Sequence, residues 1–321
     1  MSWRIVVLDP LSESRLLTMR RLLPAGFELA AASSPAPEDQ ARAIAHADFA
    51  IAGDMPLTAD LLAQAPRLRA VHKWGVGVDN FDLEAAARRS IRVLRTTGSN
   101  AGPVAETALG LMLALLRQIS AGDRGMRAGH WAKADLAPRS FTLGSRTVGL
   151  VGLGAIGGRL ATLLQGFGCR LLYAKPKPLP EARAEALHLT HVPLETLLAT
   201  SDIISLHCPL TPATRRLIDA AALSRVKEGA LLINTARGDL VDEAALLAAL
   251  VEGRLGGAGL DVFSEEPLPS LHPLASAPNV ILTPHIGASA VDNLVPTLER
   301  MFRNLACVAE GRAVDPGDVV I

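Results

Sequence analysis

The chain has 321 residues, and its 32 lysines and arginines balance 32 aspartates and glutamates. A formal net charge of zero excludes electrostatic attraction as a reason to expect a nucleic-acid or membrane partner. Its three cysteines, Cys169, Cys208 and Cys307, are far apart, which favours neither a disulfide framework nor a metal site. We therefore expect a cytoplasmic protein of about two domains, without a resident metal.

Apolar runs of strand length alternate with helix-like stretches, which is typical of parallel sheets built from βαβ units. The strands expected in the first third are Ile5–Leu8, Phe49–Ala52, Ala70–Trp74 and Ile91–Leu94. Those expected later are Val148–Val151, Arg170–Tyr173, Ile203–Leu206, Leu231–Asn234, Gly259–Val262 and Val280–Thr283. The pattern predicts an α/β protein with two doubly wound parallel sheets.

The pattern is interrupted at Thr96–Pro103, where Asn100 is suited to cap the helix that follows. A second boundary is expected near Ile286–Ser289, after which a final helix can return to the first domain. We expect residues 1–98 and 288–321 to form a substrate-binding domain. A dinucleotide-binding domain, residues 99–287, would be inserted into it.

The segment Val104–Leu116 is almost wholly apolar and is bracketed by Glu106 and Arg117. It is shorter than the roughly 20 residues that span the hydrocarbon of a bilayer. We therefore expect a helix buried at a domain or subunit junction rather than a membrane span.

A glycine-rich loop follows the strand expected at Val148–Val151. Gly152, Gly154 and Gly157 are spaced as G-x-G-x-x-G, and a helix-like stretch follows over Arg159–Gln165. The glycines allow a tight turn, a close backbone approach to phosphates and close packing of helix on strand. The helix N-terminus offers N–H groups and a positive dipole end. The motif predicts a dinucleotide cofactor.

Three of the later strands are followed by Arg237, Glu266 and His285. Ligands collect at the carboxyl ends of strands in an open parallel sheet, so these side chains are placed to meet beside a nicotinamide. Histidine exchanges protons near neutral pH, a neighbouring carboxylate orients and stabilises its imidazolium, and arginine grips a carboxylate through two hydrogen bonds. Taken singly, each could be an ordinary loop charge or surface ion pair.

These segments and the glycine loop resemble the D-isomer-specific 2-hydroxyacid dehydrogenases. The resemblance also includes Lys73–Asn80, Asn100 with Val104–Glu106, and Leu206–Thr211, in this order over most of the chain. It implies a Rossmann-type coenzyme domain inserted into a flavodoxin-like substrate domain. It also implies hydride transfer between a nicotinamide cofactor and a small 2-keto or D-2-hydroxy acid.

The resemblance implies a role for each catalytic residue. His285 would be the acid–base residue and Arg237 would hold the carboxylate and carbonyl of the substrate. Glu266 would pair with His285, rather than the adjacent Glu265, because the family's acid directly precedes a proline. The residues expected to bind the substrate are Lys73, Val76, Gly77 and Arg237.

The resemblance also implies cofactor contacts from several strand ends. Ala155 and Ile156 would face the pyrophosphate, and Asp261 would accept from the nicotinamide carboxamide, although it could simply cap a turn. The adenosine side would be formed by His207 and Pro209, and the nicotinamide pocket by Thr235 and Ala236. The full set of expected cofactor contacts is Gly152, Gly154, Ala155, Ile156, Gly157, Lys175, His207, Pro209, Thr235, Ala236, Asp261, His285 and Gly287.

One position departs from the family pattern. The second strand of such a coenzyme domain usually ends in an acid that binds both ribose hydroxyls, but Lys175 stands there and Lys177 follows. A lysine attracts a 2′-phosphate that an aspartate would repel, which favours NADP over NAD. The alternative is a solvated loop lysine, with NAD held by other contacts.

The substrate is less visible in the sequence than the reaction. We expect a small 2-keto acid such as glyoxylate or hydroxypyruvate, while a phosphorylated substrate near Lys73, as in phosphoglycerate dehydrogenases, stays open. A function of another class, a cofactor-sensing corepressor-like binding protein, is also compatible with the catalytic residues. Family resemblance further suggests a homodimer paired through the helix expected at Val104–Leu116.

Overall fold

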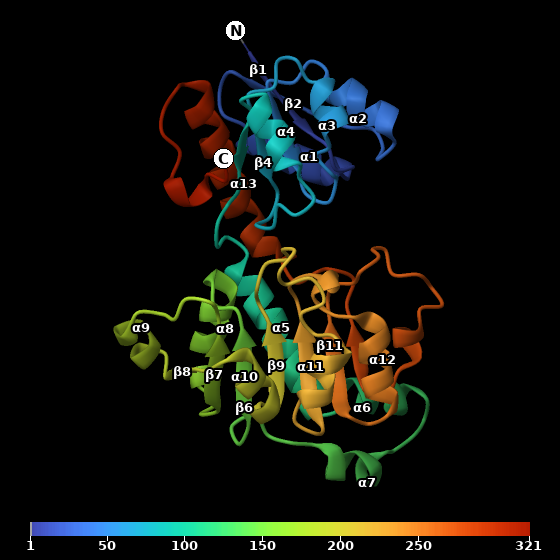
Figure 1. Ribbon diagram of the computed structural model, residues 1–321. Coiled ribbons are helices and arrows are strands. Elements are labelled where there is room, and N and C mark those ends of the chain that lie inside the picture. The colour runs from blue at the N-terminus through green and yellow to red at the C-terminus, as the bar shows by residue number, and fades with distance from the viewer. Residues whose placement is uncertain (1) are drawn as a thin grey trace. The chain divides into compact units, whose positions relative to one another are not determined.

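The computed structural model describes residues 2–321, which divide into two compact units. The first unit runs to Asn100 and resumes over Ser289–Ile321, whereas the second is the continuous stretch Ala101–Ala288 (Figure 1). Each unit is built on a parallel sheet with a hydrophobic core on both faces. The doubly wound α/β architecture predicted from the alternation of strands and helices is therefore confirmed.

Within the described residues, the first unit has a five-stranded sheet in the order β2-β1-β3-β4-β5, as in flavodoxin-like folds. Successive residues of the inner strand β1 (Trp3–Val7) enter opposite cores, with Val6 on one face and Ile5 and Val7 on the other. The strands of this sheet are β1 (Trp3–Val7), β2 (Phe27–Ala31), β3 (Phe49–Ala52), β4 (Ala70–Lys73) and β5 (Arg92–Leu94).

The last long helix belongs to the first unit, because Leu298, Met301 and Leu305 pack against Ile5 and Val7. An amphipathic helix buries one face in this way and leaves the other to solvent. The helices of this unit are α1 (Glu13–Leu22), α2 (Pro37–Ile44), α3 (Ala59–Ala63), α4 (Leu83–Arg88), α13 (Val291–Ala309) and the 3-10 turn η4 (Pro316–Asp318).

A buried ion pair ties the end of the chain to this unit. Asp318 is fully buried and accepts from Nε and Nη2 of Arg300, both at 2.8 Å, and from the N–H of Thr97 at 2.9 Å. Burial alone would raise the pKa of Asp318, but hydrogen bonds from Asn304 and Arg300 outweigh it and hold the pKa below its usual value. The network therefore joins α13, η4 and the end of β5.

Within the described chain, the second unit has a seven-stranded parallel sheet in the order β12-β11-β10-β9-β6-β7-β8. This is the Rossmann order extended by one strand. The order in which successive strands are added to the sheet reverses between β6 and β9, and ligands usually bind at such a point. The strands are β6 (Thr147–Val151), β7 (Arg170–Ala174), β8 (Leu189–His191), β9 (Ile203–Leu206), β10 (Ala230–Asn234), β11 (Leu255–Leu260) and β12 (Val280–Leu282).

The apolar segment of the sequence is an inner helix of this unit. Ala108, Leu111, Met112 and Leu115 are buried in the core on one face of the sheet. The helices of the unit are α5 (Ala101–Leu116), α6 (Ile119–Arg127), α7 (Lys133–Leu136), α8 (Ala155–Gln165), α9 (Glu181–Ala186), α10 (Leu194–Thr200), α11 (Ala220–Arg225), α12 (Glu243–Val251), η1 (Ala137–Arg139), η2 (Gly238–Leu240) and η3 (Pro273–Ser276).

Among residues 2–321, no single helix is long and apolar enough to cross a membrane. Only α5 and α6 taken together reach that length and composition, and the two helices are bent by 64° at the break between them.

The expected cap at Asn100 is wrong. Its Oδ1 is buried and has no hydrogen-bond partner within residues 2–321. The third residue of α5 is Pro103, which has no N–H for a capping side chain to bind. Two strands, β2 and β8, were missed because each lies at a sheet edge and is only partly buried, which weakens its apolar pattern.

Candidate active site

The loop after β6 packs its glycines closely against neighbouring backbone. Gly152 has a φ of +88°, and a Cβ there would lie 2.6 Å from the backbone nitrogen of Cys208. A Cβ at Gly157 would lie 2.8 Å from the carbonyl oxygen of Gly152. Neither position accepts a larger residue, so the loop stays tight between β9 and the start of α8.

The N-terminal turn of α8 is open on its outer side. Gly154 precedes the helix and is exposed, and a Cβ there would meet no atom within 4 Å. No side chain caps this end, so the N–H groups of Ala155 and Ile156 lie where the helix dipole favours an anion. The geometry fits a dinucleotide pyrophosphate.

The turn after β10 is shaped by Asn234, which no sequence motif indicated. Its Oδ1 accepts from the N–H of Ala236 at 3.0 Å, and its Nδ2 donates to the carbonyl of Arg237 at 2.8 Å. Within this turn, Oγ1 of Thr235 is buried and has no hydrogen-bond partner in the described chain. Buried hydroxyls are normally paired, so this atom fits a site where a bound cofactor supplies the partner.

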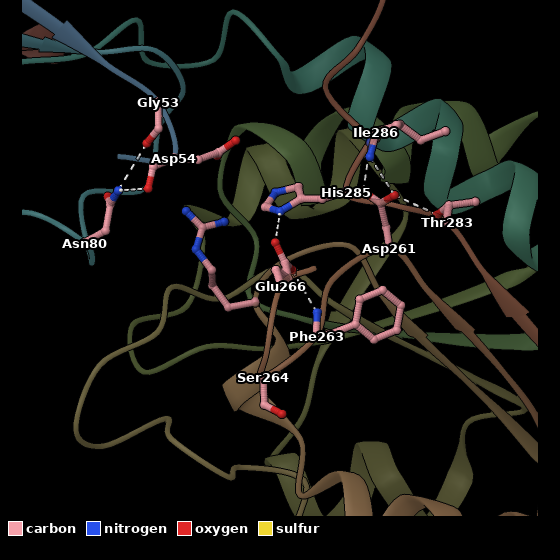
Figure 2. Close-up of polar contacts among 12 residues, drawn as sticks. Gly53, Asp54, Asn80, Asp261, Phe263, Ser264, Glu266, Thr283, His285 and Ile286 are labelled. Carbon is pink, nitrogen blue, oxygen red and sulfur yellow. Dashed lines mark hydrogen bonds and ion pairs between the residues drawn. The ribbon is translucent and has the colours of Figure 1, made fainter. Parts of the chain in front are cut away.

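His285 and Glu266 form a hydrogen-bonded pair (Figure 2). Nδ1 of His285 donates to Oε2 of Glu266 at 2.6 Å, and Oε1 of Glu266 accepts from the N–H of Phe263 at 2.9 Å. The neighbouring Glu265 is exposed and makes no side-chain hydrogen bond within residues 2–321. The geometry therefore pairs the histidine with the carboxylate directly before Pro267.

The backbone around His285 is held in place by Asp261, which is 1% exposed. Its carboxylate accepts from Oγ1 of Thr283 at 2.6 Å and from the N–H groups of Ile286 and Gly287 at 2.9 and 2.8 Å. Its carbonyl accepts from the N–H of His285 at 2.9 Å. These bonds brace His285 at a φ of +52°, which side-chain-bearing residues rarely adopt.

The pair shifts the proton affinity of both partners. The hydrogen bond to Glu266 raises the pKa of His285 above its usual value, against an opposing effect of burial. Burial raises the pKa of Glu266, but the hydrogen bonds from His285 and Phe263 outweigh it and leave the pKa lowered. Arg237 acts on both groups through its charge, lowering each pKa. The arrangement favours a protonated histidine beside an ionised glutamate.

Arg237 lies between the end of β10 and η2, with Nη1 donating to the carbonyl of Ala236 at 2.8 Å. The next residue, Gly238, packs on the backbone of Phe263, where a Cβ would lie 1.9 Å from the carbonyl carbon. Only glycine fits there, so the arginine is presented on a turn pressed against the segment that carries Glu266.

In the first unit, the predicted substrate residues lie in the loop after β4. Nζ of Lys73 donates to Oδ1 of Asn80 at 2.8 Å and also to the carbonyl of Gly53. The N–H groups of Val76 and Gly77 donate to no acceptor within the described chain. Two open backbone donors in a glycine turn suit an anionic oxygen, whereas the Lys73 ammonium is already engaged.

The loop after β3 is held by two residues that the sequence reading missed. The carboxylate of Asp9 accepts from the N–H groups of Asp54 and Met55 at 2.7 and 3.1 Å, and also from that of Gly53. Nδ2 of Asn80 donates to the carbonyls of the same three residues (Figure 2). Only the fold brings these side chains to the loop.

The predicted adenosine-side residues follow β7 and β9. His207 is half-buried against the glycine loop, and the loss of solvent around its imidazole lowers its pKa to about 4. It is therefore neutral near pH 7, and its Nε2 shares a hydrogen bond with Oγ of Ser205 at 2.9 Å. Pro209 accepts at its carbonyl from Thr214 at 2.7 Å. Lys175 is half-buried, and its side chain forms no hydrogen bond or ion pair within residues 2–321.

A family model described as D-isomer specific 2-hydroxyacid dehydrogenase, NAD binding domain, matches residues 109–287. The chain belongs to this family. It is therefore an oxidoreductase that uses a nicotinamide cofactor and acts on the CH–OH group of 2-hydroxy acids.

Members of the family are similar to this dehydrogenase over most of its length. A glyoxylate reductase from Korarchaeum cryptofilum is 39% identical over 258 residues, which cover 80% of this chain and 77% of that one. A D-3-phosphoglycerate dehydrogenase from Mycobacterium tuberculosis is 43% identical over 73% of this chain, which spans only 44% of that enzyme. The crystal structure of a Thermus thermophilus protein matches 99% of this chain and 100% of its own, with 37% identity and a TM-score of 0.86.

Replacing the glutamate should move the pH profile of this dehydrogenase. We expect His285 to supply the proton in keto-acid reduction, so the rate should fall as pH rises through the raised pKa of that residue. Glu266→Gln removes the charge that raises this pKa, and the midpoint of the fall in kcat should move to lower pH. The matched control is Glu265→Gln, which should leave the midpoint where it is. Identical midpoints in wild type and both variants would show that Glu266 does not set the proton affinity of His285.

Proposed function

We propose that this protein is an NADP-preferring reductase of small 2-keto acids, with glyoxylate or hydroxypyruvate as substrate. The observation that carries the proposal is the pair of His285 and Glu266, whose Nδ1 and Oε2 atoms lie 2.6 Å apart in the unit that contains the glycine loop. Because Glu266 occupies Nδ1, Nε2 is the ring nitrogen left to give a proton to the keto oxygen. The raised pKa of His285 keeps that proton available near neutral pH.

The other residues bind and orient the reactants. The bound cofactor supplies the hydride that reduces the carbonyl carbon. Arg237 offers a permanent charge and a planar guanidinium to the substrate carboxylate. In the other unit, the open N–H groups of Val76 and Gly77 suit an anionic oxygen. A carboxylate has about four acceptor positions, so Asp261, with three hydrogen bonds, can still accept from the nicotinamide carboxamide.

Charge at the end of β7 supports the choice of NADP. An acid at this place would bind both ribose hydroxyls and repel a 2′-phosphate, but Lys175 stands there. Lys177 follows in the same loop and is exposed. Two cations and no carboxylate at this position favour a cofactor with an additional phosphate.

The engaged state of Lys73 supports an unphosphorylated substrate. The residue is 6% exposed, and its ammonium already donates to Asn80 and Gly53. The glyoxylate reductase relative, which is matched over most of its length, points the same way. Phosphoglycerate dehydrogenase activity is the second candidate, favoured by the higher identity to the mycobacterial enzyme.

We also propose that two copies pair through α5 and the segment that follows it. No residue of α6 or α7 is buried. Large apolar side chains are exposed along this segment, namely Ile119 (57%), Met126 (56%), Trp131 (77%) and Phe141 (47%). Monomers rarely expose such a group of side chains without a partner.

A substrate panel tests the activity. With NADPH, glyoxylate and hydroxypyruvate should be reduced faster than 3-phosphohydroxypyruvate, because the Lys73 ammonium that a distal phosphate would need is already held. His285→Ala should lower kcat by about 10²–10⁴-fold, the usual cost of losing a general acid, while cofactor still binds. No turnover across a broad panel of 2-keto acids would refute the proposal. Tight cofactor binding without turnover would favour the cofactor-sensing binding protein instead.

Reversing the charge at Lys175 tests the cofactor preference. Lys175→Asp should weaken NADPH binding by roughly tenfold to a hundredfold, since a hydrogen bond to a charged group contributes about 1.5–3 kcal/mol. NADH binding should improve, and the NADPH preference of the wild type should shrink as salt rises. Arg170→Asp, at the opposite end of β7, makes the same charge change away from the ribose and should leave the ratio alone. A wild type that already prefers NADH would contradict the proposal.

Light scattering at micromolar concentration should give twice the chain mass of 33.7 kDa. Trp131→Glu combined with Met126→Glu should shift the protein toward monomer, because both side chains would lose an apolar partner surface. Leu271→Glu is the control, since Leu271 is 92% exposed but lies outside this segment. A wild type that is monomeric at these concentrations would rule the pairing out.

A further inference from the structure

We propose that Arg183 is a second cofactor-selecting residue, which together with Lys175 holds the 2′-phosphate of NADP. The inference rests on the proposed preference for NADP and extends it to a residue in α9, outside the motif that ends β7. The two cations approach the glycine loop from two directions, one beside its first glycine and the other over the first turn of α8.

Lys175 approaches from the side of the first glycine. The N–H of Gly152 donates to the carbonyl of Ala174 at 2.9 Å, so the end of β7 lies against the start of the loop. Lys175 is the next residue, and its own carbonyl accepts from Nε2 of His191 at 3.2 Å. The backbone from which the lysine side chain leaves is therefore fixed beside Gly152.

Arg183 approaches from the side of the third glycine. Nη2 of its guanidinium lies 3.6 Å from the position that a Cβ would take at Gly158, in the first turn of α8. The arginine is exposed, and its side chain forms no ion pair or hydrogen bond within residues 2–321. Two acids in the same helix, Glu181 and Glu185, are also exposed and leave the guanidinium unpaired. The cation therefore remains available beside the phosphate-binding turn.

The segment that carries Arg183 is anchored to the sheet and to α8. The N–H of Leu179 donates to the hydroxyl of Tyr173, a fully buried residue of β7, at 3.0 Å. Nε2 of Gln165 donates to the carbonyl of Ala186 at 3.2 Å, which ties the end of α9 to the end of α8. Leu179 and Leu187 pack against the core on that face. Both ends of α9 are thus fixed, and with them the backbone from which the side chain of Arg183 extends toward Gly158.

Lys175 and Arg183 together suit a phosphate dianion better than either side chain would alone. A guanidinium offers a planar fork that matches two phosphate oxygens, whereas an ammonium acts as a compact point charge. NADH carries an uncharged 2′-hydroxyl at this position, so neither cation finds a phosphate to bind there. The pyrophosphate is common to both cofactors. A residue that binds the pyrophosphate therefore affects both affinities, whereas one that binds the 2′-phosphate affects only that of NADPH.

Binding measured by calorimetry tests the assignment independently of turnover. The ligands are NADPH, NADH and the fragments 2′,5′-ADP and 5′-AMP, which lack the nicotinamide. Arg183→Ala should weaken NADPH and 2′,5′-ADP by about tenfold to a hundredfold and leave NADH and 5′-AMP unchanged. Arg183→Lys should recover part of the loss, because it restores the charge but not the fork. Arg170→Ala, an equal loss of charge at the far end of β7, should change none of the four affinities.

The outcomes separate this inference from the proposed function. Equal loss of NADPH and NADH in Arg183→Ala would place the arginine on the pyrophosphate and overturn the inference. No loss for either cofactor, in a protein that prefers NADPH, would overturn it as well and leave the role of Lys175 standing. A wild type that binds NADH more tightly than NADPH would show that the preference for NADP is itself wrong.

Discussion

The buried carboxylate of Asp261 holds together the segment that carries His285, the residue proposed to transfer the proton. It gathers the hydroxyl of Thr283 and the N–H groups of Ile286 and Gly287, while its own carbonyl receives the N–H of His285. A buried carboxylate is costly unless it is hydrogen-bonded, and here three donors satisfy it. The same bonds fix the backbone at His285 in a left-handed conformation, so the ring reaches Glu266 without rearrangement.

Close backbone packing is the second constraint, and it explains why glycine stands at particular places. At Gly152 and Gly157, an added Cβ would run into backbone atoms, and at Gly238 it would overlap Phe263. Gly154 differs, because nothing surrounds it and its value lies in leaving the start of α8 uncovered. The glycines thus serve two purposes, to bring strands and turns together and to keep N–H groups accessible to an anion.

Different charged groups around the glycine loop suit cofactor binding and the choice between NADP and NAD. The helix dipole and the uncapped N–H groups act on the pyrophosphate, which every nicotinamide dinucleotide carries. His207, neutral because of its burial, adds no charge there. The unpaired cations Lys175 and Arg183 lie instead at the margins of the loop, where the proposed contact with a 2′-phosphate would distinguish NADP from NAD. Affinity and specificity are therefore assigned to different residues of one unit.

The fold class could be predicted from the sequence, because the alternation of buried strands and amphipathic helices is a local property with a short period. The sequence also indicated His285, Glu266, Arg237 and the glycine loop, since motifs at strand ends are contiguous in the chain. The edge strands β2 and β8 escaped notice, because a half-exposed strand has a weak apolar pattern.

Contacts between segments that are distant in the sequence became visible only in the folded chain. The structure showed that Asp9 and Asn80 hold one loop from two sides, that Lys73 is engaged, and that Arg183 reaches Gly158. The cap expected at Asn100 failed because Pro103 removes the donor it needed. Sequence patterns report the period of one element, whereas such contacts depend on how separate elements pack against one another.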